Sequence, residues 1–186
     1  MTPTPSLVLA HTTLAVRDLE AMVAFYVDVL GFHVTDRGAP APGLDDMVFL
    51  SQDPAAHHQI VLVRDDDARP ASFVLADHLA FRTATLDQLR QVGGRLEAAE
   101  VEGVIPICHG NAWSLYFPDP EGNGLEVFVD TPFHVAQPFA DPLDLSMTDD
   151  ELLADLEAKV ADRDGSQPFA DWRTAFAARL ATDGEA

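Results

Sequence analysis

Two histidines and one glutamate stand where they could share a metal ion. His11 and His78 each lie near the start of a predicted strand, and Glu126 interrupts a later apolar run. Because side chains alternate along a strand, Glu126 lies on the face opposite Leu125 and Val127. Two imidazoles and a carboxylate with open coordination positions suit a divalent first-row metal, and as a facial triad they are characteristic of non-heme Fe(II). Zinc, manganese and nickel remain chemically possible. Taken alone, His11 is more often a structural histidine hydrogen-bonded within the fold, and Glu126 could equally lie on the solvated face of its strand.

An internal repeat relates the two histidines. The pattern His-x-x-apolar at His11 and Leu14 returns 67 positions later at His78 and Phe81. A second landmark, an aromatic or apolar pair followed by Asp-Pro, occurs at Phe49-Leu50 with Asp53-Pro54 and again at Tyr116-Phe117 with Asp119-Pro120. Two matched landmarks at nearly one offset indicate duplicated modules. We predict module 1 over residues 7–64 and module 2 over residues 73–130, each with the order β-α-β-β-β.

A third histidine is predicted to move protons. His57 and His58 come just before Ile60, which the repeat aligns with Glu126, so the fourth possible ligand position is apolar. His58 lies two residues before Ile60 and should point into the same cleft without reaching the metal. An ordinary imidazole pKa near 6.5 suits acid or base catalysis at neutral pH. The alternative is an exposed loop histidine.

Three further residues are expected at the substrate. Tyr116 lies on the strand that precedes the turn before Glu126. Its hydroxyl could reach a substrate oxygen; the alternative is that Tyr116 is an ordinary core tyrosine. His109, beside Gly110, and His57 are expected at the edge of the cleft, in contact with substrate. The sequence thus divides the candidates into ligands, a proton-transfer group and substrate contacts.

The elements that must position these residues follow from local signals. Asp18 is a predicted N-cap, and Gly31 ends the helix that follows it. In module 2, a capping box at Thr85 to Gln88 begins a helix that we expect to end at Gly94. The predicted strands cover residues 7–16, 32–35, 47–51, 59–63, 73–83, 96–101, 113–117 and 125–129. A curled four-stranded module with one helix cannot bury both sheet faces, so two modules should pack together and enclose a cleft.

The C-terminal segment, residues 131–186, has a different pattern. Thr148 to Glu151 forms a second capping box, followed by an apolar stripe that includes Leu152, Leu153 and Leu156. A further helix is predicted over Trp172 to Leu180. The pentapeptide Gln-Pro-Phe-Ala-Asp occurs twice, at residues 137–141 and 167–171. We expect this segment to pack on the modules or on another subunit, in a homo-oligomer.

Composition excludes several classes of protein. The formal net charge of the 186-residue chain is −20, with one lysine, so nucleic acid would be repelled over most of the surface. Cys108 is the only cysteine, which excludes an intrachain disulfide and favours a reducing, cytoplasmic setting. The sequence contains neither an export signal nor 18 consecutive apolar residues, so we expect no membrane span.

These motifs resemble the vicinal oxygen chelate superfamily, which contains glyoxalases, bleomycin resistance proteins and dioxygenases. The phrase Tyr116-Phe117-x-Asp119-Pro120-x-Gly122-Asn123-x-x-Glu126 is widespread in that superfamily and specifies fold more than reaction. The combination of residues is more similar to the type I extradiol ring-cleaving dioxygenases, which include the biphenyl-2,3-diol 1,2-dioxygenases. The likeness covers residues 7–130, and Gln137 through Glu151 resembles the C-terminal extension of the small members of that group.

The resemblance implies an α+β fold of two modules around a metal-binding cup, with a helical C-terminal extension. It also implies extradiol cleavage of a catechol by Fe(II) and dioxygen. In this reading His11, His78 and Glu126 are the iron ligands, His58 is the acid-base residue and Tyr116 is the active-site tyrosine. Two alternatives stay open: a glyoxalase-like lyase or isomerase, which would want a fourth ligand near Ile60, and an aromatic-drug-binding module without metal chemistry.

Overall fold

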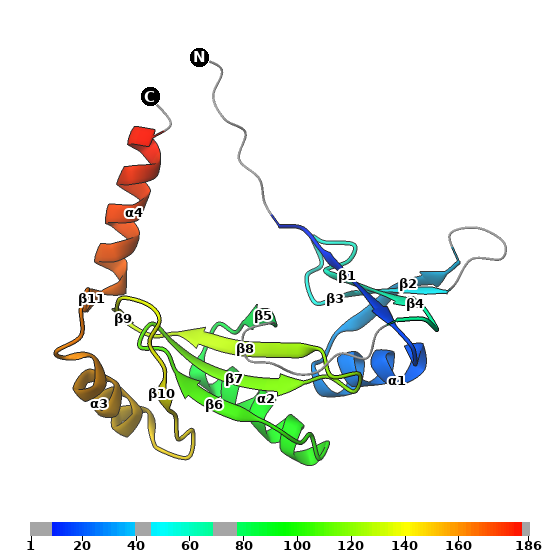
Figure 1. Cartoon of the computed structure of the whole chain (residues 1–186), viewed down its shortest axis with the longest axis horizontal. Coiled ribbons are helices and arrows are strands. Elements are labelled where there is room, and N and C mark those ends of the chain that lie inside the picture. The colour runs from blue at the N-terminus through cyan, green and yellow to red at the C-terminus, as the bar shows by residue number, and fades with distance from the viewer. Residues whose placement is uncertain (1–8, 40–45, 69–77, 184–186) are drawn as a thin grey trace.

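The structure is a computed structural model, which describes residues 9–39, 46–68 and 78–183. Two sheets, each covered by helices on one side, lie next to each other, and one C-terminal helix projects beyond them (Figure 1). The mixed α+β architecture agrees with the predicted fold class. No helix in the described ranges is long and apolar enough to cross a bilayer.

Module 1 forms a four-stranded sheet with strand order β1-β4-β3-β2. Its elements are β1 (Thr12–Val16), α1 (Leu19–Ala24), the π-helical turn η1 (Phe25–Val29), β2 (His33–Gly38), β3 (Met47–Ser51) and β4 (Ile60–Arg64). The predicted N-cap is confirmed, because the Asp18 carboxylate accepts a hydrogen bond from the backbone N–H of Ala21. Gly31 ends the helical segment with φ +80°, a conformation that favours glycine. Residues 7 and 8 of the first predicted strand lie outside the described ranges.

Module 2 forms a sheet with strand order β10-β6-β7-β8-β5, in which β10 comes from the C-terminal segment. The elements of this sheet and of the helix beside it are β5 (Leu79–Arg82), α2 (Leu86–Ala98), β6 (Ile105–Cys108), β7 (Ala112–Pro118), β8 (Gly124–Asp130) and β10 (Asp141–Pro142). In both modules the first strand pairs parallel with the last, so each module repeats one topology. The predicted strand over residues 73–83 lies only partly within the described ranges.

Two predictions for module 2 were wrong. Helix α2 does not end at Gly94 but runs to Ala98, and the next strand begins at Ile105 instead of near Leu96. Two glycines weaken an isolated helix by about 1 kcal/mol each, which the burial of Leu89 and Leu96 offsets. A Cβ atom at Gly93 would lie 3.4 Å from the Leu115 side chain, at the limit of ordinary van der Waals contact, so this glycine lies on the face of α2 that packs on the sheet.

The strand pairing also corrects the alignment of the repeat by one residue. Phe49 pairs with Val61 in module 1, as Tyr116 pairs with Glu126 in module 2. The structural counterpart of Glu126 is therefore Val61, not Ile60. Because Val61 is apolar and only 2% exposed, the expectation that module 1 supplies no carboxylate at this place is confirmed.

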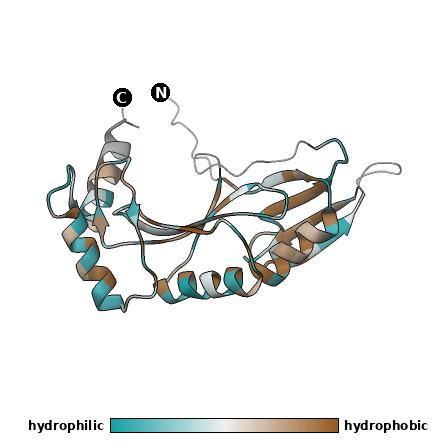
Figure 2. Cartoon of the chain, turned by 60° about the horizontal axis from the view of Figure 1, so that its bottom comes forward, coloured by the Kyte–Doolittle hydropathy of each residue, from teal (hydrophilic) through white to brown (hydrophobic). Residues whose placement is uncertain are grey.

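The two modules contact each other through helices and turns. Glu121, in the β7–β8 turn, accepts hydrogen bonds of 2.6 and 2.7 Å from the backbone N–H groups of Arg17 and Asp18 at the start of α1. A carboxylate in this position stabilises the positive end of the helix dipole. Between the modules, Phe32 also packs edge-on against Phe81 with a centroid distance of 5.7 Å. Apolar residues of both modules belong to one buried core, and hydrophilic and hydrophobic residues alternate along helices α2 and α3 (Figure 2).

The C-terminal segment packs on module 2. Its remaining elements are β9 (Phe133–His134), α3 (Asp149–Val160), β11 (Gln167–Pro168) and α4 (Phe169–Asp183). The predicted capping box at Thr148 and Glu151 is present. Leu152 and Leu156 are fully buried as expected, whereas Leu153 is 37% exposed on this chain, so its burial against another subunit stays a prediction. The stripe that α3 buries is one residue narrower than the apolar pattern indicates.

Candidate metal centre and active site

His78 and Glu126 form the core of the candidate site in module 2. His78 directly precedes β5, and the parallel pairing of β5 with β8 sets Ala80 beside Glu126. As a result, the His78 Nε2 atom lies 3.2 Å from the Glu126 Oε2 atom. Glu126 is only 8% exposed, and a buried carboxylate requires a hydrogen-bonding or charged partner. These are two metal-binding groups with adjacent donor atoms.

Tyr116 lies directly opposite Glu126 on the neighbouring strand β7. Its ring packs edge-on against the His78 ring, with centroids 5.0 Å apart. Burial, followed by the hydrogen bond to Glu126 and the charge of that carboxylate, raises the pKa of the Tyr116 hydroxyl well above its ordinary value. Tyr116 therefore keeps its proton at neutral pH and can act as a hydrogen-bond donor.

His109 is a second hydrogen-bond partner of the Tyr116 hydroxyl. The Nδ1 atom of His109 lies 2.7 Å from the backbone carbonyl oxygen of Phe139, and its Nε2 atom lies 3.0 Å from the Tyr116 hydroxyl. Because a carbonyl can only accept, Nδ1 of the neutral imidazole carries the hydrogen and Nε2 accepts one from Tyr116. Glu126 and His109 thus compete for the single hydroxyl proton of Tyr116.

A second cluster lies in module 1. The rings of His11 and His58 have centroids 4.5 Å apart, and the Phe49 ring lies 5.2 Å from that of His58. Partial burial, and then the proximity of His11 and His57, lowers the pKa of His58, so the neutral form prevails at pH 7. His57 is exposed, and its Nδ1 lies 3.0 Å from Nδ1 of His58.

The two clusters correspond to each other through the repeat. His11 precedes β1 as His78 precedes β5, and Phe49 is the counterpart of Tyr116. In module 1, His58 lies beside the first histidine, much as Glu126 lies beside His78. Strand β4 begins only at Ile60, so the loop before it carries His58 to this place.

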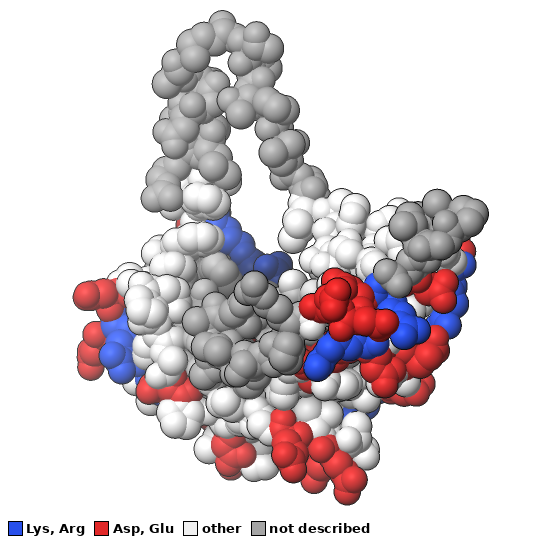
Figure 3. Space-filling view, turned by 45° about the vertical axis from the view of Figure 1, so that its right-hand side comes forward, with Lys and Arg blue, Asp and Glu red and all other residues white. Residues whose placement is uncertain are grey.

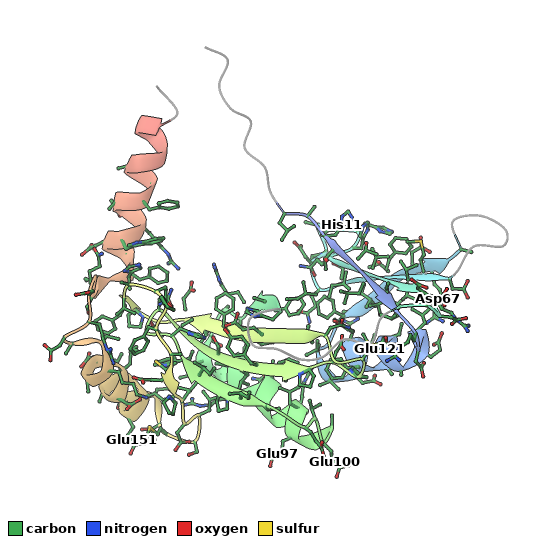
Figure 4. The ribbon with its side chains drawn as sticks, viewed as in Figure 1. His11, Asp67, Glu97, Glu100, Glu121 and Glu151 are labelled. Carbon is green, nitrogen blue, oxygen red and sulfur yellow. The ribbon has the colours of Figure 1, made fainter. Side chains whose placement is uncertain are left out.

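The clusters do not meet within one chain. Among the described residues, no three His, Cys, Asp or Glu side chains are close enough together to hold a metal ion. His11 is exposed at the N-terminal end of β1, on the upper side of module 1 as drawn in Figure 4. The structure therefore brings together His78, Glu126, Tyr116 and His109 in one group, and His11, His57 and His58 in another.

The role of the C-terminal segment in the site was not predicted from the sequence. Gln137 donates a hydrogen bond of 2.8 Å to the backbone carbonyl of His109, and Phe139 supplies the carbonyl for the His109 ring. Both residues belong to the first copy of the repeated Gln-Pro-Phe-Ala-Asp pentapeptide. The second copy has a different structure, with Gln167 in β11 and Phe169 at the start of α4. The repeated pentapeptide is visible in the sequence, but only the fold shows that its first copy contacts His109.

The surface is as acidic as the composition indicates. Acidic side chains are spread over the face drawn in Figure 3, with fewer basic ones among them. Several of the arginines are engaged in ion pairs, such as Arg173 with Asp130 and Arg37 with Glu20. This surface does not suit a polyanion such as nucleic acid.

Comparison with known proteins agrees with the resemblance drawn from the motifs. The chain is 38% identical to biphenyl-2,3-diol 1,2-dioxygenase 3 of Rhodococcus globerulus over 135 residues, which is 70% of this chain and 66% of the relative. It is 32% identical to biphenyl-2,3-diol 1,2-dioxygenase 2 of the same organism, over 70% of this chain and 65% of the relative. These matches cover just under two thirds of each relative's length.

Solved structures show the same fold. A glyoxylase/bleomycin resistance protein/dioxygenase domain from Frankia has a TM-score of 0.56 at 25% identity, over 69% of this chain and all of that domain. The fosfomycin resistance protein FosX of Listeria monocytogenes, solved with Mn(II) in its E126Q variant, has a TM-score of 0.53 at 22% identity, over 66% of this chain and 92% of FosX. The model of the Glyoxalase/Bleomycin resistance protein/Dioxygenase superfamily matches residues 8–127. The chain is thus a member of this superfamily, the vicinal oxygen chelate family.

Proposed function

We propose that this protein is an Fe(II)-dependent extradiol dioxygenase that opens the ring of a catechol next to its two hydroxyl groups. The observation that carries the proposal is the contact of His78 Nε2 with Glu126 Oε2 at 3.2 Å, with Tyr116 directly opposite Glu126. The relatives at 38% and 32% identity are named dioxygenases acting on biphenyl-2,3-diol, which supports the same reaction class.

The donor groups fit a divalent first-row metal. In the proposed site, His11, His78 and Glu126 bind the ion as two neutral imidazoles and one carboxylate, which leaves positions open for substrate and dioxygen. Fe(II) held by these residues would supply the redox chemistry by which an electron-rich catechol reacts with dioxygen. The domain assignment follows the same reasoning: the modules over residues 7–64 and 73–130 carry the site, and residues 131–186 support it.

The apolar counterpart of Glu126 favours a three-ligand site. Val61 occupies that place in module 1 and is 2% exposed. A lyase or isomerase of the glyoxalase type would require a second carboxylate at this position as a fourth metal ligand. Phe49, beside His58, offers instead an aromatic edge that suits a flat, apolar ring.

The protein's own residues would control protons and substrate orientation. His58 is neutral at pH 7 and can accept a proton from a catechol hydroxyl or return one to product. The Tyr116 hydroxyl keeps its proton, which His109 Nε2 accepts, so the Tyr116 oxygen can accept a hydrogen bond from a hydroxyl group of the substrate. Through its bond to Phe139, His109 fixes the direction in which the Tyr116 hydroxyl points. In this assignment His57 and His109 border the substrate.

The test is anaerobic loading with Fe(II), followed by exposure to air with a panel of catechols that includes biphenyl-2,3-diol. We expect about one Fe(II) per chain, since the repeat supplies one full set of three ligands. Oxygen uptake should accompany the appearance of a yellow ring-fission product. The His11→Ala, His78→Ala double variant serves as the control and should bind no iron. A wild-type protein that binds iron but consumes no oxygen with any catechol would contradict the proposal.

A further inference from the structure

One face of the sheet in module 2 is open next to Glu126. Helix α2 packs on the face of β7 that carries Leu115. Because side chains alternate along a strand, Tyr116 of β7 and its partner Glu126 of β8 point to the opposite face. Ala80 of β5 lies beside Glu126 on this open face and is exposed. Its small side chain leaves space for a ligand next to the carboxylate.

Arg82 is the nearest cation on the open face. It follows Ala80 by two residues on β5 and pairs with Phe128, which follows Glu126 by two residues on β8. Two residues along a strand span about 7 Å, so Arg82 and Phe128 form the next row of side chains beyond Glu126. His78 lies on the other side of Ala80. In the strands β5 to β8, all of which the structure describes, Arg82 is the only Lys or Arg.

The positive charge of Arg82 is only partly neutralised by the protein. Its Nε atom lies 3.8 Å from Oδ1 of Asp130, whereas Arg173 of α4 donates a hydrogen bond of 2.6 Å to Oδ2 of the same carboxylate. Two guanidinium groups thus share one carboxylate, so this group of three side chains has a net charge of one positive unit. The Arg82 side chain is 62% exposed, which leaves N–H groups of its guanidinium accessible to a ligand.

The row that carries Arg82 also offers an aromatic contact and a boundary. The Arg82 guanidinium lies 5.3 Å from the centre of the Phe128 ring. Figure 1 shows α4 leaving the sheet near the end of β8, on the side away from α2, and Arg173 connects α4 to Asp130. The open face therefore runs from the carboxylate of Glu126, past Ala80, to a positively charged end next to α4.

We propose that Arg82 binds a carboxylate on the substrate, so that the preferred catechol carries an acidic substituent. The row spacing of about 7 Å is close to the distance from a catechol oxygen to a carboxylate on the far side of the ring. A guanidinium and a carboxylate form paired, charge-assisted hydrogen bonds. One net positive charge matches a monoanion. The inference rests on the proposed dioxygenase function and adds to it the class of substituent on the ring.

Binding in the absence of oxygen tests this role without turnover. The acid 3,4-dihydroxyphenylacetate and its methyl ester have the same catechol group but differ in charge. Anaerobic calorimetry on the Fe(II)-loaded protein should give a dissociation constant about ten- to a hundredfold lower for the acid, the usual effect of a hydrogen bond to a charged group. Arg82→Met should bind acid and ester equally, and Arg82→Lys should recover part of the preference. Equal affinity of the wild-type protein for both compounds, or binding of neither, would overturn the inference.

Arg37→Met is the matched control. Arg37 is an exposed arginine of module 1 that pairs with Glu20 of α1, so this change removes the same charge at a place remote from the open face of module 2. The preference for the acid should stay unchanged. A loss as large as that in Arg82→Met would show that net charge, and not the position of Arg82, decides the preference, and the inference would fail.

Arg173 is expected to act through Asp130 as a positioning residue. In Arg173→Met, Asp130 loses its 2.6 Å partner and is free to pair more closely with Arg82, so the preference for the acid should decrease. Arg173→Met combined with Asp130→Asn should restore the preference, because no carboxylate of the protein then competes for Arg82. A merely structural role of Arg173 gives no such restoration, and its absence would contradict the sharing of Asp130.

The inference and the proposed function fail in distinguishable ways. If the acid binds more tightly than its ester through Arg82 but no catechol is cleaved in air, the proposed function fails and the anionic subsite stands. If catechols are cleaved and the acid and ester have equal dissociation constants and equal kcat/KM, the proposed function stands and this inference is overturned.

Discussion

The Nε2 atom of His78 lies 3.2 Å from Oε2 of Glu126, whereas in module 1 the counterpart of Glu126 is the buried Val61. The repeat thus provides two histidines but only one carboxylate. His58, which approaches His11 from the loop before β4, lies close to the place where a fourth ligand would be expected. Whether His58 is a metal ligand or a proton-transfer residue is therefore the first question for experiment.

Glu126→Ala and His58→Phe should fail in different ways. The first removes the only carboxylate among the proposed ligands, so we expect the purified variant to lose its iron. The second should retain iron and bind catechol, with turnover lower by roughly 10²- to 10⁴-fold, the usual contribution of a general acid or base. Metal analysis and steady-state kinetics on both variants check this. Loss of iron from His58→Phe would instead make His58 a ligand.

The two tyrosines of the chain form a matched pair for testing the hydroxyl of Tyr116. Tyr116→Phe removes the donor shared by His109 and Glu126, and we expect turnover to fall by about 10²-fold, as for the loss of one oriented hydrogen-bond donor at an active site. Tyr26→Phe removes a 3.5 Å hydrogen bond to Asp119, away from both clusters. It should cost about 1 kcal/mol of stability and leave turnover unchanged. Equal losses of turnover in both variants would assign Tyr116 a structural role only.

Two neighbouring leucines of α3 should differ strongly in their contribution to stability. Leu156 is fully buried, so Leu156→Ala should lower the free energy of unfolding by about 2–5 kcal/mol. Leu153 is 37% exposed, and Leu153→Ala should change it by less than about 0.5 kcal/mol. Urea denaturation of both variants measures the difference. Similar midpoints would mean that α3 does not pack as described.

The capping box of α3 predicts a pH-dependent stability. Hydrogen bonds from the backbone N–H and the hydroxyl of Thr148 lower the pKa of Glu151 below its ordinary value. The stabilisation from the ionised Glu151 is therefore present above its unfolded-state pKa and is lost as the pH falls through the lowered folded-state pKa. Glu151→Ala should have a lower melting temperature than wild type at pH 7, and the difference should shrink on acidification.

Glu157→Ala is the control, because Glu157 is exposed beyond the first turn of the same helix. Its effect on the melting temperature should not vary in this way with pH. A difference for Glu151→Ala that stays constant from neutral to acidic pH would contradict the role of the ionised cap.

The sequence by itself determined those features that depend on neighbouring residues. The Asp18 and Thr148 caps form because the side chain bonds to a backbone N–H within the next few residues, and strand β3 has the predicted bounds, Met47–Ser51. The repeat also revealed His11 and His78 as counterparts, since duplicated modules keep equivalent residues at a nearly constant offset. Fold class and candidate ligands followed from these local patterns.

The tertiary structure decided features that depend on contacts between distant residues. Pairing of Phe49 with Val61 depends on loop length, which shifted the alignment of the repeat by one position. Helix α2 continues past two glycines because the burial of Leu89 and Leu96 outweighs the low helix propensity of glycine. The carbonyl of Phe139 reaches His109 across 30 residues, in a contact that no local signal indicates. For the same reason, only the packing of the modules reveals that His11 lies apart from His78 within one chain.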